Sequence, residues 1–456
     1  MSVKFGTSGL RGLVTAMTSE LISRHVQAFI AACDTGGVLC VGRDLRPSSP
    51  RIAQDVINAA RAMGVRVIDC GEVPTPALAL AAQAAHGGAV MVTGSHIPAD
   101  RNGLKFYVRS GEISKADEAA ILSHLDAPHG AAHPGALELD TGANDRYIAR
   151  FVAAFGPGAL AGQRVGLYAH SAVGRDALAR ILTDLGAEVI ELGRSETFIP
   201  VDTEAVDPEV RVQIADWVKT HGLHALVSTD GDSDRPLLAD DTGRVIPGDI
   251  LGQITAETLG TEVIATPISS NSGVTMKGFK DVQLTQIGSP YVIAAMENAQ
   301  GRVVGYEANG GFLLGFEAQG PAGVLAPLVT RDCTLPILTV LYAGRKEGIA
   351  ARVAQEPPVV TVADRLQDIE QSKSRPLLET WQNDPTARAA FLTPLGKQEH
   401  HMDLTDGLRM TMTDGDVIHV RPSGNAPELR LYIETKDPVS AEKLLTQALA
   451  QLNHAL

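Results

Sequence analysis

Residues 38–96 read VLCVGRDLRPSSPRIAQDVINAARAMGVRVIDCGEVPTPALALAAQAAHGGAVMVTGSH. Three apolar runs, VLCVG, VRVIDCG and AVMV, alternate here with two segments that carry apolar residues at helical spacing. Strands that alternate with helices predict a β-α-β-α-β unit with a largely parallel sheet. The first helix is expected to have Ser49 as its N-cap, Pro50 as its first residue and Gly64 just past its end.

The same order of elements returns twice along the chain. The first repeat is RVGLYAHSAVGRDALARILTDLGAEVIELG, followed by HALVSTDGDSDR, over residues 164–235. The second has EVIATPISSNSG, a helix expected from Pro290, and GRVVGYEANGG, over residues 262–311. The copies share their architecture rather than their residues, so three similar α/β units are predicted.

The last hundred residues follow a different pattern. Two alternating segments, residues 406–424 and 428–435, predict antiparallel strands, with Asp414-Gly415 as a hairpin turn. A final helix is expected from Pro438 to about Ala455. This part of the chain is therefore predicted to be an α+β unit.

Length and charge restrict the class of protein. A chain of 456 residues is long enough for roughly three or four domains. Acidic residues outnumber basic ones 53 to 39, which gives a net charge of -14 and disfavours nucleic acid or an anionic membrane as the main partner. Four cysteines without a CxxC pair, no signal-like start and no apolar run of about 18 residues favour a cytoplasmic protein without a membrane span.

Polar, glycine-rich loops follow the predicted strands, at the strand ends where open α/β sheets bind ligands. The first such loop places Ser95 just beyond AVMV and Lys105 ten residues further on. Thr93 and Ile97 stand where a hydrolase elbow needs glycine, which excludes that motif. Ser95 is a candidate nucleophile, and the alternative is a turn serine that bonds its own backbone.

The second loop carries three carboxylates, those of Asp230, Asp232 and Asp234. In extended backbone, alternate side chains point the same way, so these three are expected to form a site for a hard cation such as Mg2+. Arg235 stands where an EF-hand needs glycine, which disfavours that motif. The alternative is a solvated acidic turn.

Two further loops are weaker candidates when each is taken alone. Glu307 and Asn309, in GYEANGG, offer hydrogen bonds to sugar hydroxyls, although the segment equally suits a structural turn. Residues 421–427, RPSGNAP, combine an arginine, a hydroxyl, an amide and backbone N–H groups, which suits either a phosphate site or an ordinary turn.

Taken together and in this order, the four loops resemble the α-D-phosphohexomutase superfamily, the phosphomannomutase and phosphoglucomutase relatives, over essentially the whole chain. Residues 5–12, FGTSGLRG, and residues 42–44, GRD, add to the resemblance. It implies three similar α/β domains with mixed, largely parallel sheets and a C-terminal α+β domain around a central cleft. The expected boundaries are 1–143, 144–247, 248–358 and 359–456.

The resemblance also implies a role for each candidate residue. Ser95 would be carried as a phosphoserine and would hold Mg2+ together with the three aspartates. The catalytic set would be Ser95, Lys105 as proton-transfer partner, Arg11 as electrostatic clamp and His96 as accessory contact. The substrate-binding set would be Arg235, Glu307, Asn309, Arg421, Ser423, Gly424 and Asn425.

The reaction implied is that of a hexose phosphomutase, an isomerase. Mannose 6-phosphate and mannose 1-phosphate would interconvert through a hexose 1,6-bisphosphate, which also serves as activator. Phosphoglucomutase or dual specificity for both sugars stays open as the alternative. A non-catalytic phosphosugar-binding protein and a metal phosphatase are further alternatives from other classes.

Three loops depart from the commoner patterns of these relatives. The serine loop has Gly94 and Ile97 where T-A-S-H-N-P is common. The sugar loop has Asn309 and Gly311 in place of the Ser and His of G-E-x-S-G-H, which removes one candidate acid/base. The phosphate loop has Asn425 where many relatives carry Thr. The departures bear on the substrate more than on the reaction class.

Overall fold

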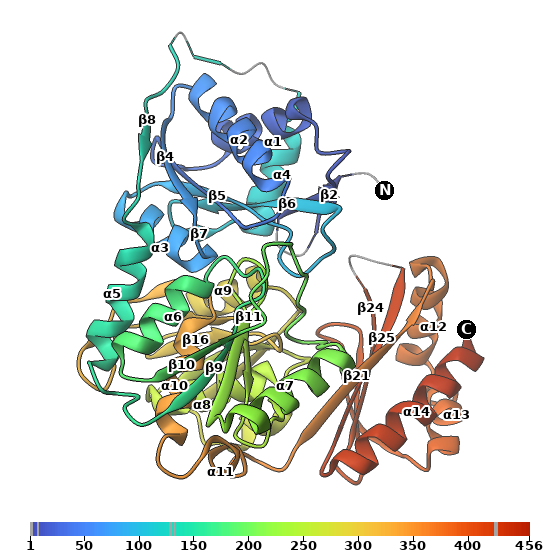
Figure 1. The fold of residues 1–456 in the computed structure, drawn as a ribbon. Coiled ribbons are helices and arrows are strands. Elements are labelled where there is room, and N and C mark those ends of the chain that lie inside the picture. The colour runs from blue at the N-terminus through green and yellow to red at the C-terminus, as the bar shows by residue number, and fades with distance from the viewer. Residues whose placement is uncertain (1–2, 7–8, 127–129, 132, 424–426) are drawn as a thin grey trace.

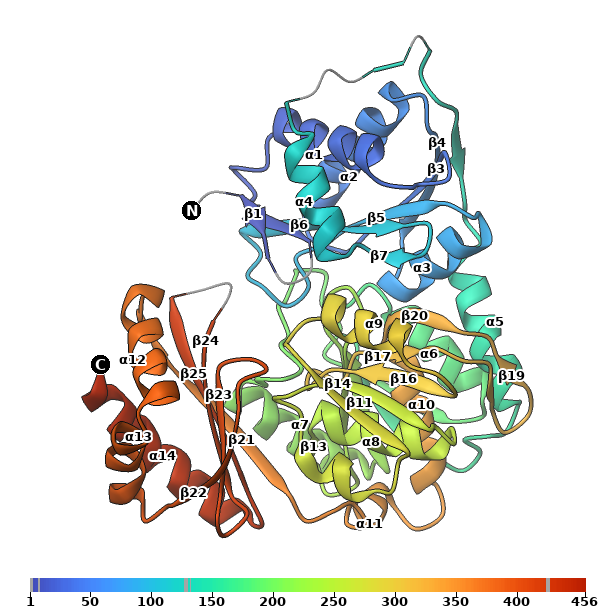
Figure 2. The same ribbon diagram turned by 180° about the vertical axis from the view of Figure 1, so that it is seen from behind.

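The structure is a computed structural model that describes residues 3–6, 9–126, 130–131, 133–423 and 427–456. Three α/β units follow one another along the chain, and a fourth unit with an antiparallel sheet lies to one side of them (Figures 1 and 2). The structure therefore confirms the predicted multi-domain α/β class.

The first unit has a mixed sheet of order β1-β2-β6-β5-β3-β4-β8, with β7 paired to β6. Strands β5, β3, β4 and β8 run parallel, whereas β6 is antiparallel to β5. The elements are β1 (Lys4–Phe5), β2 (Leu10–Leu13), α1 (Ser19–Ala32), β3 (Val38–Arg43), α2 (Ser49–Ala62), β4 (Arg66–Glu72), α3 (Thr75–Ala84), β5 (Gly88–Val92), β6 (Arg101–Val108), β7 (Gly111–Glu112), α4 (Lys115–Ser123) and β8 (Leu137–Leu139).

One helix boundary in this unit differs from the prediction. Helix α2 begins at Ser49 itself, and Ser48 is its N-cap residue, without a side-chain capping bond. The Ser49 hydroxyl instead donates to Asp44 Oδ1 at 2.5 Å. A bond to the buried carboxylate of Asp44, in the loop that leads into the helix, thus takes the hydroxyl that capping would have used.

The second unit has the strand order β10-β9-β11-β12-β13, in which the first three strands are parallel. The third has the order β15-β14-β16-β17-β20, again with three parallel strands. The second unit comprises α5 (Ala143–Phe155), β9 (Arg164–Tyr168), α6 (Arg175–Asp184), β10 (Glu188–Leu192), α7 (Pro208–His221), β11 (Ala225–Thr229), β12 (Pro236–Ala239) and β13 (Val245–Ile246). The third comprises α8 (Gly248–Thr258), β14 (Val263–Pro267), η1 (Ser272–Met276), β15 (Asp281–Thr285), α9 (Ser289–Asn298), β16 (Val303–Tyr306), β17 (Phe312–Leu314), β18 (Ala318–Gln319), β19 (Val324–Leu325), β20 (Leu328–Asp332), α10 (Thr334–Gly344) and α11 (Ile349–Val353).

The fourth unit has an antiparallel sheet of order β21-β25-β24-β23-β22. The hairpin at Asp414-Gly415 and the final helix from Pro438 to Ala455 lie where the sequence predicts them. Its elements are β21 (Val360–Gln367), α12 (Gln371–Asn383), α13 (Pro385–Leu392), η2 (Thr393–Leu395), β22 (Glu399–Asp403), β23 (Leu408–Met412), β24 (Val417–Pro422), β25 (Glu428–Thr435) and α14 (Pro438–Ala455).

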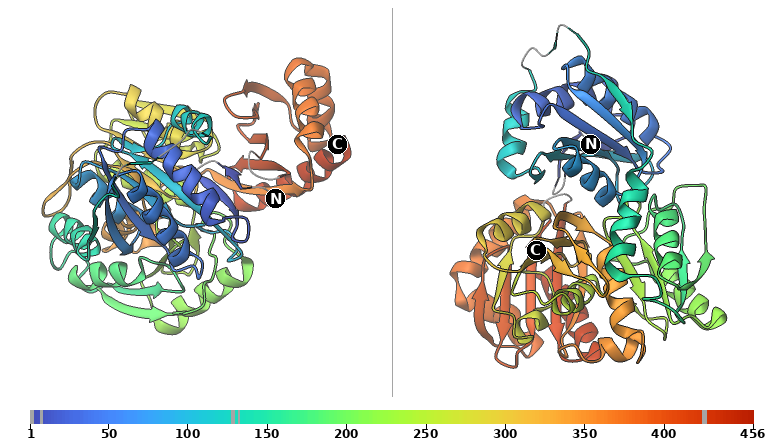
Figure 3. Two further views of the ribbon diagram at one scale, coloured as in Figure 1. Left: turned by 90° about the horizontal axis from the view of Figure 1, so that it is seen from above. Right: turned by 90° about the vertical axis from the view of Figure 1, so that its left-hand side faces the viewer.

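One apolar cluster joins the first three units. It contains Leu78 on α3, Phe151 on α5 and Leu251 on α8, all fully buried. The fourth unit has a separate cluster around Trp381 and Ile433. The first three units therefore share a core, whereas the fourth stands apart, as the view from above shows (Figure 3). Among the described residues, no helix combines the length and apolar character that crossing a bilayer needs.

The shared core makes a stability prediction. Phe151 is fully buried and packs edge-on against Tyr147, with ring centroids 5.1 Å apart. Phe151→Ala should lower the free energy of unfolding by about 3–5 kcal/mol, because a cavity remains where the ring was. Val212→Ala, at a position 71% exposed on α7, should change it by less than about 0.5 kcal/mol. Urea unfolding checks this, and equal effects of the two variants would contradict the shared core.

Candidate active site

Ser95 lies three residues beyond the end of β5, in a tight and fully buried turn. Its φ is +55°, a conformation that side-chain-bearing residues seldom adopt, so the surroundings must hold the turn in place. The backbone N–H of Ser95 donates to Thr93 Oγ1 at 2.8 Å, and its hydroxyl donates to Asp230 Oδ2 at 2.5 Å. The structure therefore joins the candidate nucleophile directly to the acidic loop of the second unit.

Arg46 holds the backbone of the serine turn through hydrogen bonds. Its guanidinium is fully buried and donates to four carbonyl oxygens, at 2.6–2.9 Å. The four carbonyls belong to Ser95, Ile97, Pro98 and Arg101. A Cβ at Gly94 would lie 2.6 Å from Cζ of Arg46, so the glycine leaves space for the guanidinium. Sequence reasoning missed Arg46, and glycine instead of alanine at position 94 was the available signal.

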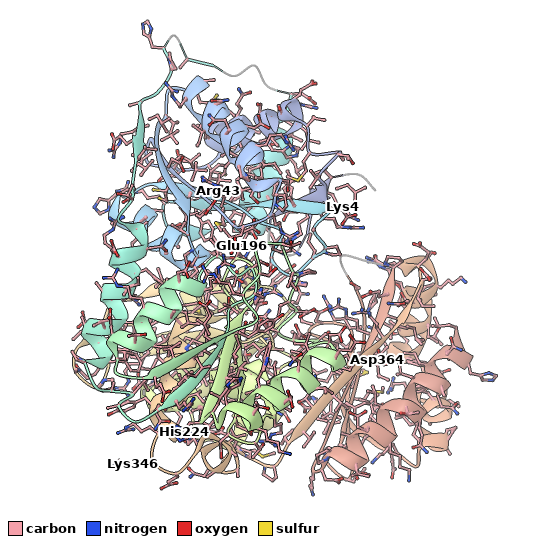
Figure 4. All side chains as sticks on the ribbon, viewed as in Figure 1. Lys4, Arg43, Glu196, His224, Lys346 and Asp364 are labelled. Carbon is pink, nitrogen blue, oxygen red and sulfur yellow. The ribbon has the colours of Figure 1, made fainter. Side chains whose placement is uncertain are left out.

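Asp44 and Phe198 hold Arg46 in turn. Asp44 Oδ2 accepts from Arg46 Nε at 3.2 Å and from Thr93 Oγ1 at 2.7 Å. The ring centroid of Phe198 lies 4.1 Å from Arg46 Cζ, a cation–π contact. Phe198 belongs to the loop after β10, and Figure 4 labels Glu196 of the same loop where the first unit meets the second. The serine turn is thus supported from two units.

Asp230, Asp232 and Asp234 follow β11 and are fully buried. Each offers a carboxylate oxygen, and these oxygens lie within 4.8 Å of one another. They converge because the backbone turns at Ser233, where φ is +57°, and not because the segment is extended; that part of the prediction was wrong. The turn also lets Asp230 Oδ1 accept from the backbone N–H groups of Asp234 and Arg235, both at 3.2 Å.

The three carboxylates fit a divalent cation. Within the described residues, Asp232 Oδ1 and Asp234 Oδ1 are buried and have no hydrogen-bond partner. Burial and the neighbouring negative charges of Asp232 and Asp234 raise the pKa of Asp230 well above its usual value. Carboxylate oxygens without partners in a buried cluster form the donor set that a hard cation prefers. This trio is therefore a candidate divalent-metal site.

Two basic side chains approach this trio from the first sheet. Lys105, on β6, donates from Nζ to Asp232 Oδ2 at 2.5 Å and also to Asp234 Oδ2. Arg11, on β2, lies in register with Gly103 of β6. Burial and the positive charge of Arg235 lower the pKa of Arg11 to about 10, so Arg11 stays charged at neutral pH. Both residues supply positive charge close to Ser95.

His96 lies beside the nucleophile as an uncharged ring. Its Nδ1 accepts from Arg235 Nη1 at 3.0 Å and lies 3.3 Å from Ser95 Oγ. Burial, followed by the positive charge of Arg235, lowers the pKa of His96 to about 3. Arg235 therefore contacts His96 in this structure, and its Nε is 3.7 Å from Asp234 Oδ1.

The sugar loop joins β16 to β17. Glu307 and Asn309 are both buried. Glu307 Oε2 accepts from Arg331 Nη1 at 3.2 Å, and Asn309 Oδ1 accepts from the backbone N–H of Gly311 at 3.0 Å. The amide oxygen of Asn309 thus stabilises its own loop. Arg331, on β20, is a functional candidate that sequence reasoning missed.

The candidate phosphate loop makes its contacts mainly within the fourth unit. Arg421 Nε lies 2.9 Å from Asp406 Oδ2, and the backbone N–H of Ser423 donates to Glu428 O at 2.8 Å. Among the described contacts, Arg421 has none with the Ser95 centre. Gly424 and Asn425 lie outside the described residues, as do residues 7–8 of the first motif. The structure therefore brings three of the four loops together.

Comparison with known proteins agrees with this fold. Three family models match the chain, described as phosphoglucomutase/phosphomannomutase alpha/beta/alpha domain I at residues 2–129, alpha/beta/alpha domain II at residues 145–243 and C-terminal domain at residues 349–451. The fold and these family matches together define a multi-domain phosphosugar enzyme. The chain belongs to the phosphoglucomutase/phosphomannomutase family.

Individual relatives cover the whole chain. A phosphomannomutase of Sinorhizobium fredii is 42% identical over 100% of both chains. A phosphomannomutase of Salmonella muenchen is 40% identical over 100% of this chain and 96% of its own. A solved family structure from Burkholderia thailandensis, 20% identical, covers 99% of this chain and 97% of its own with a TM-score of 0.80, which supports the fold.

The acidic trio makes a metal-binding prediction. Asp230→Asn should weaken binding of Mn2+, used as a probe for a divalent cation, by at least about tenfold, because one charged ligand is lost. The amide oxygen can still accept the backbone bonds that Asp230 now accepts. Asp216→Asn, on the exposed side of α7, should leave the affinity unchanged. Calorimetric titration measures both, and equal affinities would contradict the site.

Proposed function

We propose that this chain is a phosphomannomutase that interconverts mannose 6-phosphate and mannose 1-phosphate through a phosphoserine. The observation that carries the proposal is the 2.5 Å hydrogen bond from Ser95 Oγ to Asp230 in the buried acidic trio. A hydroxyl held against a cation site, with Lys105 beside it, suits transfer of a phosphoryl group. The two relatives named phosphomannomutase, at 42% and 40% identity, support the choice of mannose.

The proposed reaction consists of two phosphoryl transfers, one from Ser95 to the sugar and one from the sugar to Ser95. In the first, the bond between phosphorus and Ser95 Oγ breaks, a bond forms from phosphorus to the free hydroxyl oxygen of the hexose monophosphate, and the proton of that hydroxyl ends on Ser95 Oγ. The product is a hexose 1,6-bisphosphate and an unphosphorylated Ser95. In the second, the other phosphoryl group of the reoriented bisphosphate returns to Ser95. The bisphosphate therefore also loads the enzyme with phosphate.

We assign Mg2+ to Asp230, Asp232 and Asp234, together with the phosphate on Ser95. The ion would neutralise charge on the phosphoryl oxygens. The chain's own cations add to this, because Lys105 and Arg11 lie on the same side of the trio. We assign proton transfer to Lys105 and charge stabilisation to Arg11. His96 is uncharged and serves as a neutral contact beside Ser95.

The remaining residues would hold the two ends of the sugar. Glu307 and Asn309 would bind hydroxyl groups, with Arg235 behind the metal loop. Arg421, Ser423, Gly424 and Asn425 would hold the phosphate that does not react. Since Arg421 pairs with Asp406 and has no described contact with the Ser95 centre, we expect the phosphate loop of the fourth unit to move toward Ser95 during turnover. We place the hinge for that motion at residues 356–360.

The surroundings favour a small anionic substrate inside the cytoplasm. Lys105, Arg11, Arg235 and Arg331 concentrate positive charge around Ser95, although the chain as a whole is acidic. All four cysteines are free thiols, which suits a reducing compartment. Hexose phosphates are the ligands that this charge and the family suggest.

A substrate panel tests the proposal. With Mg2+ and a trace of hexose 1,6-bisphosphate, mannose 1-phosphate should be converted with the highest kcat/KM among mannose, glucose and glucosamine 1-phosphates. Ser95→Ala should lower kcat by at least about a thousandfold, because the nucleophile is lost. Asp216→Asn serves as the control with unchanged activity.

The same panel separates the alternatives. A preference for glucose would replace the proposal by a phosphoglucomutase, and similar values for both sugars would indicate dual specificity. Steady release of inorganic phosphate would indicate a phosphatase. Binding of hexose phosphates without turnover, unaffected by Ser95→Ala, would indicate a phosphosugar-binding protein.

A further inference from the structure

Three consecutive polar side chains, Thr330, Arg331 and Asp332, are buried at the end of β20, each at most 3% exposed. Thr330 Oγ1 donates to Glu112 Oε1 at 3.1 Å, on β7 of the first unit. Asp332 Oδ1 accepts from the hydroxyl of Tyr147 at 2.8 Å, on α5 of the second unit. Contacts on either side thus fix the strand from which Arg331 reaches into the active site.

The guanidinium of Arg331 bridges two loops of the site. Its Nε and Nη2 each lie 3.1 Å from Asp234 Oδ2, and its Nη1 donates to Glu307 Oε2 at 3.2 Å. Arginine remains protonated in proteins, so these are charge-assisted bonds at any ordinary pH. One side chain therefore fixes the sugar-loop carboxylate relative to the candidate metal loop.

Gly311 is the residue that makes room for this side chain. A Cβ at position 311 would lie 2.7 Å from both Cγ and Cδ of Arg331, and 3.0 Å from its Cβ. Gly311 is not among the glycines with positive φ, so its backbone conformation does not require glycine. Space for the Arg331 stem is the remaining requirement. The side chain that many relatives carry here would displace Arg331.

We propose that Arg331 is a positioning residue of the phosphomutase reaction, and that Gly311 and Arg331 act as a matched pair. Arg331 holds the Glu307 carboxylate toward the hydroxyl groups of a hexose phosphate and keeps Asp234 in place. This role rests on the proposed function, whereas the pairing with Gly311 does not. Because arginine keeps its proton, the pair does not replace a histidine as acid or base.

Kinetics of Arg331 variants test the positioning role. Arg331→Ala should lower kcat/KM by about tenfold to a hundredfold, mainly through KM, as loss of a group that orients a ligand does. Arg331→Lys should recover only part of this, because an ammonium group cannot bridge two carboxylates as the guanidinium fork does. Neither variant should change the pH dependence of kcat/KM, because arginine takes no part in proton transfer.

Rescue distinguishes positioning from stability alone. Added guanidinium ion should restore part of the kcat/KM of Arg331→Ala, measured well below its unfolding temperature. The matched control is Arg388→Ala, which breaks a partly buried ion pair, to Glu399 at 2.5 Å, in the fourth unit. Arg388→Ala should unfold at a lower temperature than the wild type, and added guanidinium ion should not raise its kcat/KM. An Arg331→Ala enzyme within twofold of the wild-type kcat/KM would overturn the positioning role.

A double-mutant cycle tests the pair. Gly311→Ala alone should lower both the unfolding temperature and kcat/KM, because the new methyl group displaces Arg331. In the Arg331→Ala background, Gly311→Ala should lower the unfolding temperature only slightly, because the side-chain stem that the methyl group would meet is absent. Additive losses in unfolding temperature would overturn the pairing. If the wild type converts no hexose phosphate, the proposed function fails, and the unfolding cycle still decides the pairing.

Discussion

The carboxylates of Asp232 and Asp234 hold the first three units together. Lys105 reaches both from the first sheet, and Arg331 reaches Asp234 from the third. The hydroxyl of Thr75, at the start of α3, donates to Asp232. Buried charges are costly unless they are paired, and loss of one partner typically costs about 3–5 kcal/mol. The metal loop is therefore a structural junction as well as the proposed chemical centre.

Two buried arginines place the other loops around this junction. Arg46 holds the backbone of the serine turn, and Arg331 holds the carboxylate of the sugar loop. Each passes close to a glycine, Gly94 in one loop and Gly311 in the other, where a Cβ would lie 2.6 or 2.7 Å from the arginine. Gly94 and Gly311, one departure in each loop from the commoner family patterns, thus have a related role: each leaves space for a buried arginine, the guanidinium group of Arg46 at Gly94 and the side-chain stem of Arg331 at Gly311.

Sequence alone could predict the features that depend on local order. The alternation of strands and helices, the hairpin at Asp414-Gly415 and the three aspartates after β11 are all local patterns, and the structure contains them. Arg46 and Arg331 were missed because their partners lie far away in sequence. Ser95 is 49 residues from Arg46, and Asp234 is 97 residues from Arg331. Ser49 was misassigned as a cap for a different reason: the helix begins one residue earlier than predicted, and the Ser49 hydroxyl binds the nearby carboxylate of Asp44.

The fourth unit differs from the rest in its core and in its place relative to the site. Its apolar cluster is separate, and the ion pair of Arg421 with Asp406 lies outside the junction. Asp406 Oδ2 also accepts from the backbone N–H of Ile287 at 3.0 Å, so the fourth unit contacts the third beside its candidate phosphate loop. A hydrogen bond between these two units is compatible with motion of the fourth unit relative to the first three.

In the proposed reaction, Ser95 carries the phosphoryl group during turnover. Peptide mass spectrometry of the enzyme after incubation with mannose 1,6-bisphosphate tests it most directly. The proposed reaction predicts phosphate on Ser95 and, when this phosphate is isotopically labelled, passage of the label from Ser95 into hexose phosphates once mannose 6-phosphate is added. Turnover with Ser95 unmodified throughout, or with the phosphate on another residue, would contradict it.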